Sequence, residues 1–349
     1  MINAAIVNTI LCVILLDWNF LTIIREAETA HILAICFFSL LWGFGNVGFG
    51  YSIQIAGIGL GTTLTMSVIA VIGTLLPLLL DVDGMLLTAS GGVIVLGLFI
   101  CALGFVAASK ALALKDVDEL VANGSSMVKK GDIEVAASST TAEVELTSIT
   151  IANPAIAQTT TTTTTATRTS SSKIPPSSTY KITVCLVAGL FCTMLQFAFV
   201  LGEDVRTITE EYVSKPRSSA IIWIFALIFG TLPSIISSLF NAHKAGTLSN
   251  LRKSEYRTGN YLKCLFGMSL PWVSHAHLYG ISAGSLMGTF GAALGWPLLI
   301  VTSNVTGLVV GWRFLGEWDV AGEESINYLK FALALNIFGM GVVCVGGLL

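Results

Sequence analysis

Charge is scarce in this 349-residue chain. Only 11% of its residues are Asp, Glu, Lys or Arg, against about 25% in soluble domains, and its mean hydropathy is +0.81. Residues 39–80 contain none of these residues and no histidine. A helix of about 20 apolar residues crosses the hydrocarbon core of a bilayer. The composition therefore excludes a water-exposed globule and predicts a multi-pass integral membrane protein, in a plasma membrane or an endomembrane.

The signatures of several functional classes are missing. A net charge of −3 disfavours nucleic acid as a partner, because binding that polyanion needs a concentrated basic surface. No phosphate-binding Gly-x-x-x-x-Gly-Lys-Ser/Thr loop is present, which disfavours an ATP-driven pump. Neither a His-Glu-x-x-His motif nor paired intramembrane acids occur, so no enzyme is predicted. The seven cysteines lack metal-ligand spacing, and neither a metal nor a cofactor is expected.

Hydropathy predicts an all-α bundle of about nine transmembrane helices. The loop over 241–263 carries five Lys or Arg residues and one acid, whereas the loop over 203–217 carries four acids and three bases. Because cytoplasmic loops are enriched in Lys and Arg, the first loop is predicted inside and the second outside. The spans are expected near 2–22, 31–55, 59–80, 90–109, 181–201, 218–240, 262–283, 288–312 and 327–348.

A polar segment separates the spans into two groups. Residues 110–180 include an unbroken threonine run over 159–165 and too few apolar residues to offset the entropy of ordering. We therefore predict a disordered Ser/Thr-rich linker over 110–180. It would lie between a first transmembrane repeat of four helices, 1–109, and a second of five helices, 181–349.

The two groups share one order of elements: a glycine-rich turn, a helix with hydroxyl side chains, an acidic turn and a closing helix. An odd number of spans separates the copies, so they would be inverted in the membrane. Inverted repeats that bind substrate between them are a recurrent plan of transporters. The matching segments are 57–61, 62–80, 81–84 and 91–109 in the first copy, and 284–288, 289–312, 316–319 and 328–348 in the second.

Polar and aromatic side chains inside the spans are the candidate binding residues, because lipid exposure of polar groups is costly. Trp42 and Asn46 share one helix face at helical spacing, as Trp296 and Ser303 do. A lone threonine can instead bond to its own helix, and a tryptophan can lie at the membrane interface. The predicted substrate-binding residues are Trp42, Asn46, Thr62, Thr65, Gln196, Tyr279, Trp296 and Ser303.

Histidine offers a group that titrates near neutrality. His275 and Tyr279 lie one helical turn apart, whereas His277 lies about 200° from His275 around the helix. The two histidines therefore cannot face one pocket, which excludes a simple two-histidine metal site. His275 is the first candidate for proton coupling, with a structural role as the alternative. Asp17, the one acid inside an apolar predicted span, is the second, although the neighbouring Trp18 also fits an interfacial position.

Certain motifs resemble the bacterial L-rhamnose–proton symporter family. They are Leu-Trp-Gly-Phe-Gly-Asn over 41–46, Tyr51, the turn over 57–61, Ile-Gly-Thr-Leu over 72–75, Gly-Leu-Val over 307–309 and Gly-Glu-Trp-Asp-Val-Ala-Gly over 316–322. The resemblance implies the drug/metabolite transporter fold, with ten helices in two inverted repeats, and proton-coupled sugar uptake. The chain departs from that pattern because the first family helix is missing and the linker is an addition.

The leading interpretation is a symporter of protons and a neutral monosaccharide, L-rhamnose or a related 6-deoxy sugar, that works by alternating access. No predicted span has Lys or Arg in its middle, which favours a neutral substrate over an anion. The alternatives are a facilitator or exchanger of another metabolite, such as a nucleotide sugar, and a non-transporting truncated paralogue. The expected partners are the sugar, protons and the lipid bilayer.

Overall fold

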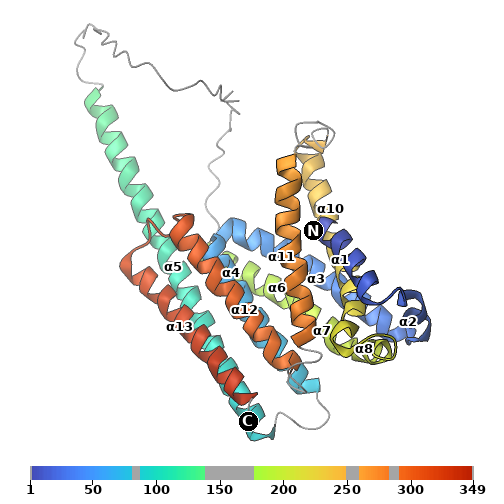
Figure 1. Ribbon diagram of the computed structural model, residues 1–349. Coiled ribbons are helices and arrows are strands. Elements are labelled where there is room, and N and C mark those ends of the chain that lie inside the picture. Colours follow the sequence, from blue (N-terminus) through green and yellow to red (C-terminus); the bar gives the residue numbers. More distant parts are fainter. Residues whose placement is uncertain (1, 81–86, 138–176, 249–258, 283–290, 348–349) are drawn as a thin grey trace, which may run out of the picture.

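A computed structural model describes residues 2–80, 87–137, 177–248, 259–282 and 291–347, and these residues form helices without a strand (Figure 1). Predicted turns over 81–84 and 284–288 lie outside the described residues. The helices are α1 (Ile2–Leu15), α2 (Phe20–Glu26), α3 (Thr29–Ala56), α4 (Ile58–Leu80), α5 (Ala89–Ala137), α6 (Ser178–Cys192), α7 (Met194–Leu201), α8 (Glu203–Thr209), α9 (Lys215–Ser218), α10 (Ala220–Lys244), α11 (Gly259–Ile281), α12 (Gly291–Val309), the π-helix η6 (Val310–Phe314) and α13 (Glu323–Gly346).

The described part of the chain contains seven helical segments that are long and apolar enough to cross a membrane. The bent pair α1 and α2 makes an eighth if it counts as one span. The helix α11 occupies the place of the remaining predicted span but is not among these segments. The fold is thus that of a multi-pass helical bundle, and the count of nine spans stays a prediction.

The first predicted span is broken rather than continuous. Helices α1 and α2 meet at an angle of 82°, and the residues between them include Asp17 with φ 47° and Trp18 with φ 65°. Left-handed backbone is uncommon for residues other than glycine. Hydropathy averages the character of side chains and carries no information on such backbone angles, so it gave no sign of this bend. The expectation of one straight helix over 2–22 is therefore wrong.

The helix α5 continues well past the predicted end of its span, and Figure 1 shows it projecting beyond α12 and α13. Asp116 accepts hydrogen bonds from Ser178 and Lys181 at the start of α6. Asp118 accepts the backbone N–H of Gly322, next to α13, over 2.7 Å. The predicted disordered linker is thus helical over 110–137. Its first turns are hydrogen-bonded to the start of α6 and to the residue before α13. Residues 138–176 lie outside the described residues.

Elements that the repeat pattern equates pack against each other, α4 against α12 and α5 against α13. A methyl group on Gly97 of α5 would come within 2.6 Å of the carbonyl oxygen of Gly339 on α13. The two backbones are thus in direct contact, as small residues permit between membrane helices. The predicted turn over 57–61 is confined to Gly57, which has φ 83°, and α4 begins at the next residue.

Candidate functional site

A cavity of about 520 Å³ lies between α3, α4, α6, α7, α10, α11 and α12. Helices from both groups of spans therefore build it. None of its seventeen lining residues is Asp, Glu, Lys or Arg, and one is histidine. The lining consists of Trp42, Asn46, Phe49, Met66, Ile69, Cys192, Leu195, Trp223, Pro271, Trp272, His275, Ala276, Tyr279, Trp296, Leu299, Ile300 and Ser303.

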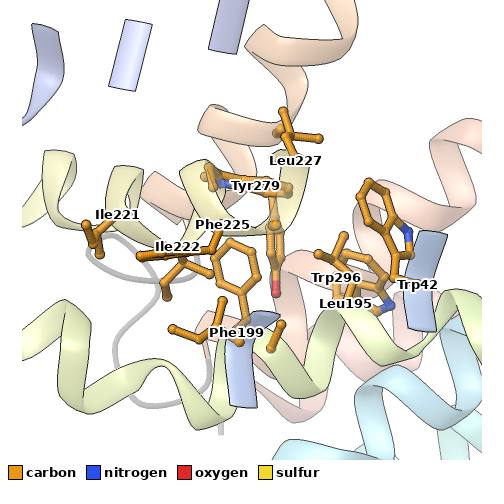
Figure 2. Packing of buried hydrophobic residues seen from close by; sticks show 14 of the residues in the cluster. Trp42, Leu195, Phe199, Ile221, Ile222, Phe225, Leu227, Tyr279 and Trp296 are labelled. Atoms are coloured by element: carbon orange, nitrogen blue, oxygen red, sulfur yellow. The ribbon is translucent and has the colours of Figure 1, made fainter. Parts of the chain in front are cut away.

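Aromatic rings form much of the cavity wall. The rings of Trp42 and Trp272 are stacked with centroids 6.0 Å apart, and the edge of Trp223 meets Trp272 at 6.4 Å. Tyr279 packs edge-on against Trp296 at 5.2 Å. Figure 2 shows Trp42, Tyr279 and Trp296 within this cluster of buried hydrophobic residues. Large rigid rings give broad apolar contact with a defined shape.

The polar groups of the wall differ in how well they are satisfied. The hydroxyl of Tyr279 donates to Oε1 of Gln196 over 2.7 Å, and that of Ser303 donates to the carbonyl of Leu299 over 3.0 Å. The amide nitrogen Nδ2 of Asn46 is buried without a hydrogen-bond partner among the described residues. Nε1 of Trp223, in the same wall, is likewise buried without a partner among the described residues. Leaving a buried donor unsatisfied costs about 1–3 kcal/mol, so Asn46 and Trp223 each offer a donor to a ligand oxygen.

The structure brings six of the ten predicted site residues to this one cavity. They come from three helices, α3, α11 and α12, and in each case two residues one or two turns apart share the inward face. Gln196 lies just behind the wall, where it holds the Tyr279 hydroxyl. The six are Trp42, Asn46, His275, Tyr279, Trp296 and Ser303.

Three predicted site residues lie elsewhere. Thr62 packs where α4 meets α12, because a methyl group on Gly307 would come within 2.8 Å of its Cγ2. Thr65 lies 3.3 Å from the hydroxyl of Ser52 on α3. These two threonines therefore face neighbouring helices. Asp17 lies at the bend after α1, with its side chain 58% exposed, and pairs with Arg217 over 3.2 Å.

Eleven of the lining residues were not predicted, and the tryptophans Trp223 and Trp272 are among them. Trp223 lies in the strongly apolar start of α10, where eight consecutive residues, Ala220 to Leu227, are buried. A tryptophan in such a run is indistinguishable from ordinary core. Only the placement of α10 and α11 beside α3 shows that these rings line a cavity.

The fold and the cavity define a multi-pass helical membrane protein with a mostly apolar, partly aromatic cavity between its helices. Residues 2–167 match the family model described as L-rhamnose-proton symport protein. The L-rhamnose-proton symporter of Cronobacter sakazakii is 31% identical over 94 residues, which are 26% of this chain and 27% of that protein. The resemblance that the motifs indicated is thus confirmed for the N-terminal part of the chain.

Further relatives are the L-rhamnose-proton symporters of Yersinia pestis bv. Antiqua and Yersinia pseudotuberculosis serotype O:1b, each 30% identical over 89 residues. These alignments cover 25% of this chain and 26% of each relative. The chain thus spans about a quarter of the length of the curated relatives it matches. No solved structure matches the chain. The family match includes Trp42 and Asn46 but ends before the part of the chain that holds His275 and Tyr279.

Proposed function

We propose that this chain is a proton-coupled secondary transporter of a neutral monosaccharide, with L-rhamnose or a related 6-deoxy sugar as its substrate. The observation that carries the proposal is the cavity between the two groups of spans. Its volume of about 520 Å³ falls within the range of small-molecule sites, about 300–1,000 Å³. Similarity to the L-rhamnose-proton symport protein family supports a sugar and a proton as the transported species.

The chemistry of the cavity wall supports a neutral, partly apolar substrate. A charged substrate would need an opposite charge at this depth, and the lining residues contain no acid and no Lys or Arg. The stacked Trp42 and Trp272 rings offer a surface for the C–H face and the methyl group of a deoxy sugar. The Nδ2 group of Asn46, which has no partner among the described residues, would donate to a sugar hydroxyl, with Ser303 and Tyr279 in the same wall.

His275 is the proposed proton-coupling residue, because it is the titratable imidazole that lines the cavity. A neutral imidazole can take up a proton without placing a permanent charge in the membrane. Sugar and proton would bind in one cavity, and if protonation of His275 raises the affinity for sugar, bound sugar raises the affinity for the proton by the same factor. Asp17 is the second candidate and would act from the exposed bend, through its pair with Arg217.

Alternating access would follow from movement of the two groups of spans around the cavity. Each group contributes wall residues, such as Met66 on α4 and Leu299 on α12. A facilitator or exchanger of another metabolite, such as a nucleotide sugar, is the alternative function. It would show no dependence on a proton gradient, and a nucleotide sugar would compete with the labelled substrate.

The role of Asn46 tests the site directly. We expect Asn46→Leu to raise the KM for sugar exchange in proteoliposomes by about tenfold, because one buried hydrogen bond to the ligand is lost. Gln54→Leu is the matched control, because this amide side chain is exposed on the same helix and should leave the KM unchanged. An Asn46→Leu protein with the wild-type KM would show that Asn46 does not bind the sugar.

A further inference from the structure

Helix α1 contributes no residue to the described cavity wall, yet it makes two buried hydrogen bonds to helices that do. Asn8 is fully buried. Its Nδ2 donates to the backbone carbonyl of Trp223 on α10 over 3.0 Å. Its Oδ1 lies 2.9 Å from Nε2 of His277 on α11. One amide side chain thus joins three helices.

The chemistry of the partners fixes the direction of both hydrogen bonds. A backbone carbonyl only accepts, so the NH₂ group of Asn8 must face Trp223 and its oxygen must face His277. That oxygen also only accepts, so Nε2 of His277 carries a proton and donates. The Sγ atom of Cys12, one turn further along α1, lies 3.6 Å from the same nitrogen. His277 is thus held by α1, on the side of α11 away from His275.

Both residues that Asn8 holds are directly connected to the cavity wall. Trp223 is itself a wall residue, and its ring packs against His277 at 6.5 Å and against Tyr279 at 6.5 Å. His277 lies in the sequence between the wall residues His275 and Tyr279. A change in the distance between α10 and α11 would therefore move Trp223 relative to Tyr279.

We propose that Asn8 and His277 are positioning residues for the sugar site. Asn8 sets the spacing of α10 and α11, and thereby the relative placement of Trp223 and Tyr279, without touching the substrate. The inference rests on the proposed function for what the site binds. Binding sites depend on such supporting contacts, because a wall that is loose by about 1 Å loses much of its affinity.

Exchange kinetics in proteoliposomes test the proposal. Asn8→Leu and His277→Phe keep the approximate volume but remove the hydrogen bonds. Each should raise the KM for sugar about tenfold, because a displaced Trp223 loses part of its contact with the sugar, and the double variant should be no worse than either single one. His277→Gln retains an N–H donor and should keep a KM close to that of the wild type. Single variants with the wild-type KM would overturn the proposal. So would a double variant whose rise in KM equals the product of the two single rises.

A second readout does not depend on transport. Cys12 is fully buried at the interface of α1 with α11. In a full-length chain whose other six cysteines are replaced, it should therefore react slowly with a membrane-permeant maleimide. Asn8→Leu should accelerate that reaction, because α1 loses its hold on α10 and α11. Unchanged labelling would contradict the positioning role. A wild-type protein that exchanges no sugar would instead refute the proposed function, and the labelling result would still stand.

Discussion

The side chain of Glu317 caps the first turn of α4 by accepting the backbone N–H of Gly59 over 2.9 Å. Its other oxygen accepts the N–H of Ile58 over 2.6 Å. A carboxylate at a helix N-terminus is favoured by the helix dipole, and such hydrogen bonds are charge-assisted. Glu317 belongs to the Gly-Glu-Trp motif of the second group of spans, and α4 to the first. The motif that carries part of the family resemblance thus forms a hydrogen-bonded contact between the two groups of spans.

Removal of this cap should destabilise the protein. We expect Glu317→Ala to lower the free energy of unfolding by about 1.5–3 kcal/mol, the range for hydrogen bonds to a charged group. Glu317→Gln should have an intermediate effect, because its side chain offers a single acceptor oxygen. The midpoint of thermal unfolding in detergent measures both. Glu211→Ala is the control, since Glu211 is exposed, and an equal loss in that variant would argue against a specific role of Glu317.

Gly73 on α4 sets the position of a cavity tryptophan. A methyl group there would come within 2.4 Å of Nε1 of Trp296, which donates to the carbonyl of Ile69. Gly73→Ala should displace the indole and raise the KM for sugar exchange by about tenfold. Gly50→Ala should have no effect, because no atom of the described residues lies within 4 Å of a methyl group added there. Equal KM values in the two variants would show that the position of Trp296 does not matter.

The predicted orientation can be checked with single cysteines in the two loops. Glu211→Cys lies in the acidic loop that is predicted to face outward, and Thr247→Cys in the basic loop that is predicted to face inward. A membrane-impermeant maleimide should label position 211 in intact cells and position 247 only after permeabilisation. Direct labelling of both positions would contradict the predicted orientation.

The segment predicted as a linker, 110–180, divides into a part with contacts, which lies within α5, and a remainder. Deletion of 120–175 should leave transport within a few-fold of the wild type, because the contacts to α6 and α13 are made by Asp116 and Asp118. Asp116→Ala, by contrast, should lower the free energy of unfolding by about 3 kcal/mol, because it leaves the charge of Lys181, whose side chain is 10% exposed, without its partner. Loss of all transport in a deletion protein of normal abundance would show that the segment does more than connect.

Six of the seventeen lining residues of the cavity could be predicted from helical periodicity. Polar residues in apolar helices avoid lipid, so pairs such as Trp42 with Asn46 and His275 with Tyr279 indicated which helix faces look inward. The structure places all four residues at the cavity. The same reasoning misplaced Thr65, because a buried hydroxyl that bonds to a neighbouring helix gives the same pattern.

Other features depend on contacts that one sequence does not reveal. Asp116 and Lys181 are 65 positions apart, and without that pairing the end of α5 has the composition of a linker. Asn8 and His277 are 269 positions apart, so nothing local distinguishes Asn8 from any polar residue near an N-terminus. The bend at Asp17 and Trp18 requires left-handed backbone at two residues that seldom adopt it.

Uptake of radiolabelled L-rhamnose into proteoliposomes, with and without an inward proton gradient, tests the central claim most directly. We expect the wild type to accumulate sugar above the external concentration only when the gradient is present. His275→Gln should abolish that accumulation while counterflow exchange persists, and His277→Gln should retain it. Accumulation by His275→Gln with normal pH dependence would move the proton site to another residue, with Asp17 the next candidate. If uptake by the wild type does not depend on the proton gradient, proton-coupled transport is contradicted.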